Sequence, residues 1–372
     1  MIRLEVARVQ QMRDVWPGVT RAWVTSEADG ARLSALAYTA IVGELNLGDL
    51  VQVNTNALRR GLGTGGDAFV VARVPSPTGG DAADAADEPR GHMMKARYTP
   101  QQMLVDALDD PASPHHGIID AARSLDALPV VVADLHSSLG SIAAGVLAER
   151  PGARIVYLHT DGAALPAAYS RQNAALRDAG ILAATISTGQ SFGGDAEAVS
   201  TPSALMAARH VYGADVAIVS QGPGNLGTGT TWGFSGVQVA DVLNQVGALG
   251  GVPIAALRVS EADQRARHAG LSHHSATVLE TLTYPSVLLP VPEAELTAVD
   301  AEVRDALVSI NARRVAAGRP AHSFQPTPRG GLLEAIAALP SPVSTMGRGL
   351  DEDPSAFLYA ALAGRAAARV AA

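Results

Sequence analysis

The polar residues best able to do chemistry follow a series of short apolar runs in the middle of the chain. Asp134, His136, His159 and Asp161 lie at the ends of two of these runs, and Arg258 lies near the end of a later one. Imidazole and carboxylate groups act as general acids and bases, and a carboxylate can also orient a histidine or bind a divalent metal. Because ligands bind beyond the carboxyl ends of parallel strands, these residues predict a catalytic surface at one edge of a sheet.

A glycine-rich stretch from Ser220 to Thr231 is the sharpest single motif. It contains G-x-G-x-x-G at Gly222, Gly224 and Gly227, and we expect it to follow a strand and open a helix. The motif does not follow the first predicted strand, and no acidic residue ends the next strand, so it favours a phosphate or carboxylate over a dinucleotide. A purely structural glycine turn is the alternative. The residues expected to bind the anion are Gly222, Gly224, Asn225, Gly227, Thr228, Thr230, Arg258, Arg267 and Lys95.

A second basic group, RARHAGLSHHS over residues 265–275, places imidazoles at a predicted helix N-terminus. His273 is therefore a candidate general acid beside an anion site. Histidines and carboxylates suit Zn²⁺, Mn²⁺ or Fe²⁺, but no H-E-x-x-H or comparable spacing appears, so the metal ligands stay unknown. Adjacent histidines usually point different ways, so at most one of His273 and His274 needs a function. Ser137 or Ser138 beside His136 is a third alternative, as a nucleophile without the G-x-S-x-G elbow.

Apolar runs alternating with helical stretches predict the element that positions these residues. Runs without polar alternation, most of them followed by an Ala- and Leu-rich stretch, are typical of buried parallel strands in βαβ units. They indicate an α/β fold with a Rossmann-like doubly wound parallel sheet. The six runs are PVVVADL (129–135), RIVYLHT (154–160), ILAATIS (181–187), DVAIVSQ (215–221), VPIAALRVS (252–260) and SVLLPVP (286–292).

The rest of the chain divides by composition. The N-terminal part carries short β-branched segments separated by turn signals, and we expect a small barrel or sandwich. Thr99 as N-cap and Pro100 at the first position predict a helix over Thr99–Leu108. An Ala-rich amphipathic segment, 350–372, is a candidate interface for a homo-oligomer. The predicted parts are a β-rich domain (1–74), a linker or mobile loop (75–91), a connecting helical segment (92–128), the Rossmann-like α/β domain (129–292) and a helical C-terminal extension (293–372).

Composition excludes several classes of protein. Apolar residues make up 47% and charged residues 17%, which suits a large core and not disorder. A net charge of −8 argues against nucleic acid or an anionic membrane as the main partner. No apolar run is long enough to span a membrane and no signal peptide is seen, so we expect a cytoplasmic protein. No cysteine is present, which removes disulfides and thiolate chemistry, and Lys95 is the single lysine.

Several segments resemble an uncharacterised bacterial family, the domain-of-unknown-function family DUF3866, found in actinobacteria and spore-forming relatives. The resemblance rests on the segments GHMMKARYTPQQ (91–102), DLHSSLG (134–140), TDGAALP (160–166), SQGPGNLGTGTTWGFSG (220–236) and RHAGLSHHS (267–275), and it spans most of the chain. It implies a bacterial cytosolic protein and carries over no activity, cofactor or catalytic residue.

The residues therefore predict an enzyme, a transferase or hydrolase, that acts on a small anionic or phosphorylated metabolite. In this hypothesis the glycine-rich segment binds the anion, and His136, His159 or His273 serves as general acid or base, with Asp134 or Asp161 orienting it. The alternative is a non-catalytic nucleotide- or metabolite-sensing or scaffold protein. The cofactor stays unknown, and both a divalent metal and a nucleotide are compatible with these residues.

Overall fold

The computed structural model describes residues 2–61, 65–74, 90–294 and 297–371. Two compact units make up the chain: one contains residues 1–90 and 96–103, and the other contains residues 91–95 and 104–372. The segment predicted as a linker, 75–91, lies outside the described residues up to position 89. Each unit is described by itself below.

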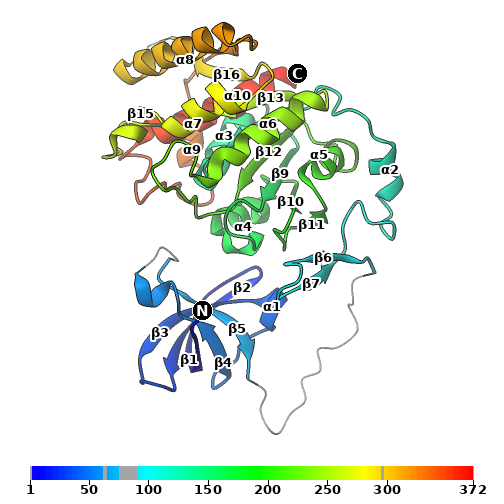
Figure 1. The fold of residues 1–372 in the computed structure, drawn as a ribbon, viewed down its shortest axis with the longest axis vertical. Coiled ribbons are helices and arrows are strands. Elements are labelled where there is room, and N and C mark those ends of the chain that lie inside the picture. The colour runs from blue at the N-terminus through cyan, green and yellow to red at the C-terminus, as the bar shows by residue number, and fades with distance from the viewer. Residues whose placement is uncertain (1, 62–64, 75–89, 295–296, 372) are drawn as a thin grey trace. The chain divides into compact units, whose positions relative to one another are not determined.

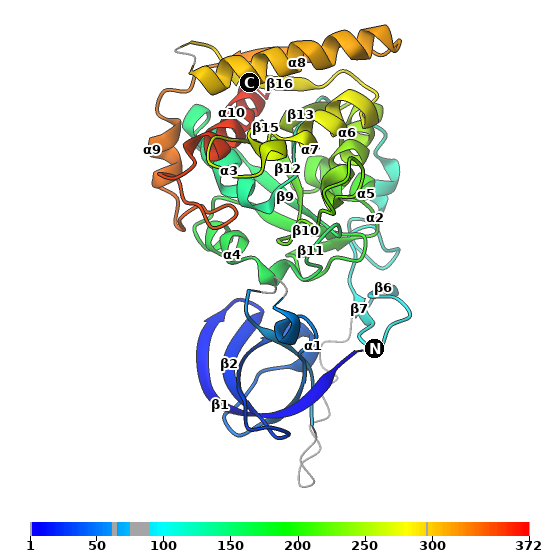
Figure 2. The ribbon, with the colours of Figure 1, turned by 60° about the vertical axis from the view of Figure 1, so that its left-hand side comes forward.

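The first unit is a closed five-stranded barrel in the order β1-β2-β3-β5-β4, visible as the blue ring of strands in Figure 2. Alternate side chains fill it, as Val51 and Val53 of one strand do, because successive residues of a strand point to opposite faces. The barrel confirms the predicted β-rich N-terminal part. Its elements are β1 (Leu4–Trp16), β2 (Val19–Ser26), β3 (Arg32–Tyr38), α1 (Thr39–Val42), β4 (Leu50–Asn54) and β5 (Ala68–Arg73).

The second unit is built on an eight-stranded sheet in the order β11-β10-β9-β12-β8-β13-β16-β17. Every neighbouring pair in it is parallel. All six predicted runs are strands, which confirms the Rossmann-like α/β fold. The strands are β8 (Pro129–Ala133), β9 (Ile155–Thr160), β10 (Ala184–Thr188), β11 (Ala196–Ala198), β12 (Val216–Gln221), β13 (Val252–Ala256), β16 (Leu288–Pro292) and β17 (Ser323–Thr327).

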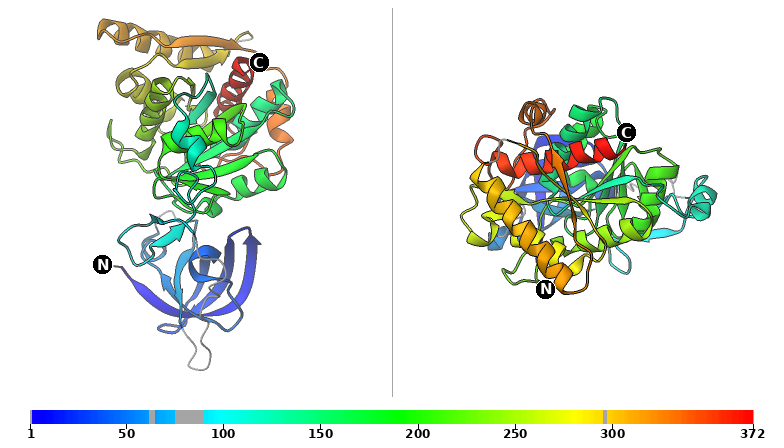
Figure 3. Two further views of the ribbon diagram at one scale, coloured as in Figure 1. Left: turned by 90° about the vertical axis from the view of Figure 1, so that its right-hand side faces the viewer. Right: turned by 90° about the horizontal axis from the view of Figure 1, so that it is seen from above.

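Helices cover both faces of this sheet (Figures 1 and 3). Val131 and Ala133 of β8 pack with α3, α4 and α10 on one face. Val130 and Val132 of the same strand pack with α5, α6 and α8 on the other face. The helices are α2 (His116–Ala121), α3 (Leu139–Glu149), α4 (Arg171–Asp178), α5 (Thr201–His210), α6 (Gln238–Ala248), α7 (His273–Thr277), α8 (Ala298–Ala316), α9 (Leu332–Ala337) and α10 (Pro354–Val370). No helix in the described ranges combines the length and apolar character needed to cross a membrane.

The strand order creates a crevice between two central neighbours, β8 and β12. After β8 the chain passes through α3 to β9, on one side of this pair, and after β12 it passes through α6 to β13, on the other side. The two connections leave on opposite faces of the sheet, since most buried apolar residues of α3 belong to one core cluster and those of α6 to the other. Such a topological switch point is the usual ligand site of an open parallel sheet.

The predicted helix over Thr99–Leu108 is wrong. Ala96 and Tyr98 have positive φ angles of 48° and 60°, and the Thr99 hydroxyl donates to the Ala96 carbonyl, which closes a turn. A short strand, β7 (Met103–Val105), follows this turn. Within the predicted helical segment 92–128, α2 is the one α-helix among the described residues.

The C-terminal extension is not purely helical, because residues 323–327 add β17 to the edge of the sheet. The segment predicted as an oligomer interface, 350–372, is largely buried inside the chain. Its helix α10 is buried along nearly all its length and packs against α3 within the chain. The alanine-rich face is therefore internal. Its small side chains let α10 and α3 approach closely.

Candidate functional site

Asp134 occupies the centre of the switch point, one residue beyond β8. Its Oδ2 accepts hydrogen bonds from His274 Nδ1 at 2.9 Å and from Arg258 Nη1 at 3.0 Å. Its Oδ1 accepts one from Asn225 Nδ2 at 2.5 Å, and its carbonyl accepts one from Gln221 Nε2 at 3.0 Å. Side chains from three places in the sequence, Asn225, Arg258 and His274, therefore meet on one buried carboxylate, and Gln221 bonds the backbone beside it.

The electrostatics of Asp134 follow from these partners. Burial raises the pKa of its carboxyl group, but the hydrogen bond from His274 and the charge of Arg258 outweigh burial, so the pKa lies below its usual range. A buried carboxylate with this set of donors stays ionised. It can therefore fix the ring of His274 and hold the guanidinium of Arg258 in place.

A pocket lies next to this carboxylate, on the far side of Arg258. It is a shallow depression open to solvent, and about 390 Å³ of space, open solvent included, lies within its outline. Ser137 and Ser138, at the N-terminus of α3, line it together with Arg258 and Arg348. Within the described ranges the one side-chain hydrogen bond that Arg258 donates goes from Nη1 to Asp134, so its Nε and Nη2 donors are available to a ligand. The pocket thus offers an anion two guanidinium groups and two hydroxyls.

Three histidines gather on the other side of Arg258. His268 comes from the short 3-10 turn η6 (Ala266–His268), and His273 and His274 are the first two residues of α7. Ser272 caps this helix by accepting from the His274 backbone N–H, and its hydroxyl also hydrogen-bonds His268 Nδ1 at 2.8 Å. Among the described residues, these three histidines form a group that could hold a metal ion.

His136 and His159, both predicted as catalytic, lie in a separate buried network. The Tyr157 hydroxyl is 3.2 Å from His136 Nδ1 and 3.3 Å from His159 Nδ1. His136 Nε2 lies 2.5 Å from the hydroxyl of Ser170, and His159 Nε2 lies 2.9 Å from the carbonyl of Ala164. Both nitrogens of each ring are engaged within the protein, so this arrangement stabilises the loops around β8 and β9.

Burial lowers the pKa of His136 to about 3 and that of His159 to about 4. Between pH 6.5 and pH 4, His159 is protonated in the unfolded chain but not in the folded protein. The free energy of unfolding therefore falls as the pH drops from 6.5 towards 4. His159 alone should contribute roughly 3 kcal/mol to this loss. Urea unfolding between pH 7 and pH 4 should therefore show a shallower pH dependence for His159→Gln than for the parent. Parallel profiles for the two proteins would contradict this assignment.

The glycine-rich segment does not open a helix, which corrects that expectation. Helix α6 begins at Gln238, well beyond Gly227, and the residues between form a small turn closed by a bridge between Gly227 and Phe234. The Thr228 and Thr230 hydroxyls bond each other at 3.0 Å within this turn. The glycines are therefore kept apart from the helix dipole that a dinucleotide-type cradle needs.

Individual glycines of this segment have other roles. A Cβ atom on Gly222 would lie 2.4 Å from the Ala164 carbonyl oxygen, so Gly222 allows two loops to pack closely. Gly224 has a φ of 101°, which permits the turn that brings Asn225 to Asp134. Of this segment, Gln221 and Asn225 thus reach the site.

The remaining predicted residues are dispersed. Asp161 accepts from the backbone N–H of Gln190 at 2.9 Å and from Gln238 Nε2 at 3.1 Å, which joins three loops. Arg267 is exposed. The pKa of His273 is lowered by burial first, then by the charge of His274 and then by that of Arg267. Lys95 is fully buried and forms an ion pair with Glu197 at 3.4 Å. Of the predicted site residues, the structure brings Asp134, His273, Asn225 and Arg258 together.

The residues given a role from the sequence did not include His268, His274, Arg348 or Gly236, although the segment 265–275 was noted. A Cβ atom on Gly236 would lie 1.8 Å from Asp134 Oδ1, so this glycine lets the start of α6 approach the carboxylate. The H-x₄-H-H spacing, with Ser272 as N-cap, was the signal available for the histidines, because a short turn before the N-cap can bring His268 back to the start of the helix, as the His268–Ser272 hydrogen bond shows. Arg348 had no signal, since its position depends on the fold of the C-terminal segment.

Comparisons with known proteins agree with the resemblance of the motifs. No curated protein matches this chain, and no solved structure matches it. A family model described as a protein of unknown function (DUF3866) matches residues 34–364, which is most of the chain and includes every residue of the site at the switch point. The chain therefore belongs to the DUF3866 family of proteins of unknown function.

Proposed function

We propose that this protein is an enzyme, a transferase or hydrolase, that acts on a small anionic or phosphorylated metabolite at the carboxyl ends of β8, β12 and β13. One observation carries the proposal: buried Asp134 holds both His274 and Arg258, and Arg258 also lines the open pocket. An anion-binding group and a cluster of histidines are thereby joined through one carboxylate. Such a combination is typical of a catalytic site.

The pocket suits the charged part of the substrate. Guanidinium groups bind phosphate and carboxylate through two parallel hydrogen bonds, and the Ser137 and Ser138 hydroxyls add neutral donors. Asp263 and Asp353 also line the pocket and pair with Arg348 at 3.5 and 3.1 Å. Their charges favour a monoanion or dianion over a polyphosphate, because each added negative charge meets these carboxylates.

The reactive part of the substrate then lies towards the histidines. Arg258 holds negative charge that develops during bond cleavage, and the histidine cluster provides the group that activates the attacking oxygen. Attack by water makes the protein a hydrolase, and attack by a hydroxyl of a second substrate makes it a transferase.

Binding is tested first, by thermal shift with inorganic phosphate, sugar phosphates, mononucleotides and dicarboxylates. An anion present at about 100 times its dissociation constant should stabilise the protein by about 2.7 kcal/mol. Arg258→Lys keeps the charge beside Asp134 but removes the planar fork, and it should weaken binding at least about tenfold. Arg313→Lys is the matched control, since Arg313 pairs with Glu280 on the surface of the same unit. A panel without any stabilising anion, or unchanged binding by Arg258→Lys, would rule out the pocket.

The second candidate is a sensor or scaffold, favoured by the exposed tip of the glycine-rich segment. Leu226 is 72% exposed and Trp232 is 57% exposed, and large apolar side chains of this kind often contact a partner. The two functions separate once an anion is found. Product formation that disappears in Asp134→Asn, with anion binding retained, supports the enzyme, whereas binding without turnover in the parent protein supports the sensor.

A further inference from the structure

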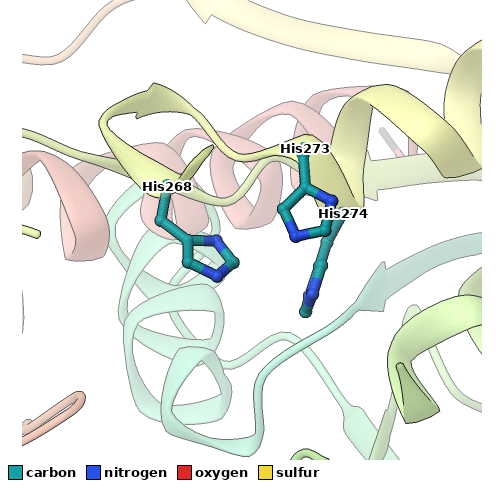
Figure 4. A group of neighbouring side chains, drawn as sticks. All are labelled: His268, His273 and His274. Carbon is teal, nitrogen blue, oxygen red and sulfur yellow. The ribbon is translucent and has the colours of Figure 1, made fainter. Parts of the chain in front are cut away.

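The rings of His268, His273 and His274 lie together at the start of α7, as Figure 4 shows. Their ring centroids are separated by 5.0 Å for His268 and His273, by 5.0 Å for His268 and His274, and by 4.5 Å for His273 and His274. Each ring offers one nitrogen such that all three nitrogens lie within 4.8 Å of one another. His268 and His274 are buried and His273 is half-buried.

Two of these rings are held from behind by hydrogen bonds on Nδ1. His274 donates from Nδ1 to the Asp134 carboxylate, and His268 Nδ1 bonds the Ser272 hydroxyl. With the proton on Nδ1, the lone pair of Nε2 points away from these partners and is free to bind a cation. A carboxylate behind a histidine is the usual arrangement at metal sites, because it fixes the tautomer and strengthens the ligand.

The third ring, that of His273, has a buried nitrogen without a hydrogen-bond partner in the described part of the chain, which is independent evidence for a ligand. Nε2 of His273 is inaccessible to solvent and makes no hydrogen bond to any described residue. A buried polar nitrogen without a partner is costly, and one explanation is a bound ion. The ring of Phe234 stacks on His274 at 3.8 Å with an interplanar angle of 8°, which holds that imidazole in its plane.

The surrounding charges allow a cation to enter. The positive charge of Arg258 is paired with Asp134, and that of Arg265 is paired with Asp263 at 2.6 Å. Arg267 is exposed, so water screens it. The charges of Arg258 and Arg265 are thus each offset by a carboxylate in this part of the chain.

We propose that His268, His273 and His274 bind one divalent transition-metal ion, with Zn²⁺ as the best fit. Three imidazole nitrogens from the protein suit Zn²⁺, and they leave a fourth position for water or substrate, as catalytic zinc sites do. Bonds of about 2.0–2.1 Å in a tetrahedral site require nitrogens about 3.3 Å apart, so small rotations of the rings close the site around the ion. The inference deepens the proposed function, because the ion lies beside Arg258, but metal binding is measured without any substrate.

The experiment uses the full chain after treatment with a chelator and exchange into metal-free buffer. Titration calorimetry with Zn²⁺ should give one ion per chain with a dissociation constant below about 1 μM. Co²⁺ should bind at the same stoichiometry and develop the intense visible absorption of a four-coordinate site. Protein that takes up no Zn²⁺ in this range overturns the proposal, whatever the anion panel gives.

Variants then locate the ion. His268→Asn and His273→Asn should each weaken Zn²⁺ binding by more than the roughly 10–100-fold expected for Asp134→Asn, which removes only the supporting carboxylate. His210→Asn is the matched control, since this imidazole lies on α5 and bonds the Ser124 carbonyl, and it should leave binding unchanged. Circular dichroism and urea unfolding confirm that each variant folds. Binding that survives both His268→Asn and His273→Asn in folded protein places the ion elsewhere and overturns the proposal.

Discussion

Lys95→Met should lower the free energy of unfolding by about 3–5 kcal/mol, because it leaves Glu197 as a buried carboxylate without its cation. Lys95 is completely buried, and its Nζ lies 3.4 Å from Glu197 Oε2 and donates to the Ala198 carbonyl at 3.2 Å. Burial lowers the pKa of Lys95 and raises that of Glu197 to about 7, and the attraction between the two opposes both shifts. Each group is therefore tolerated inside only while the other is present.

The double variant Lys95→Met with Glu197→Leu is the matched control. It replaces both charges with apolar groups of similar size, which is often neutral, so most of the lost stability should return. Urea denaturation of the parent, both single variants and the double variant gives the coupling energy directly. A Lys95→Met variant within about 1 kcal/mol of the parent would show that the pair is not a buried ion pair, and would return Lys95 to the list of anion-binding candidates.

Gly364→Val should destabilise the protein by at least about 3 kcal/mol, the upper end of overpacking effects. A Cβ atom on Gly364 of α10 would lie 1.9 Å from the carbonyl oxygen of Ile142 on α3. The reciprocal contact is as close, since a Cβ atom on Gly145 of α3 would lie 2.0 Å from the Ala361 carbonyl oxygen. Backbone atoms cannot rotate aside, so the two helices must move apart and open the core between them.

Gly117→Val provides the control, because Gly117 lies in α2 and a Cβ atom there meets nothing within 4 Å. It should change stability by no more than the small helix-propensity difference between glycine and valine. Thermal and urea unfolding of both variants makes the comparison. Equal stabilities for Gly364→Val and Gly117→Val would contradict the close backbone packing of α3 against α10.

Secondary structure was predicted correctly where the local pattern of apolar residues allows only one kind of burial. An apolar run such as PVVVA of β8 has no polar face, so it is stable only as a strand covered on both sides. The Ala- and Leu-rich stretch expected after this run is α3, Leu139–Glu149. The strands that were missed are those without such a run. β11 has three residues, and β17 contains Pro326, which an edge strand tolerates because one side of it needs no donor.

The failures arise where a local signal has two meanings. Thr99 followed by Pro100 resembles a helix start, but the Thr99 hydroxyl closes a turn onto Ala96. The segment 350–372 has the alanine content of a helical interface, and the glycine at 364 and its alanine neighbours serve a crossing inside the chain. Small residues permit close approach to any partner, so their spacing does not say whether the partner is another chain or another helix.

The sequence by itself determined the fold class and the strand ends where polar residues gather, and it named Asp134, His273 and Arg258 as candidate site residues. Those properties depend on periodicity and on residue chemistry, which are local. Only the tertiary structure decided that Asp134 is the hub, that His136 and His159 belong to a buried network, and that His268 and His274 join His273. Strand order decides which loops become neighbours, and that order results from packing among distant segments; Asp134 and His274, for example, are 140 residues apart along the chain.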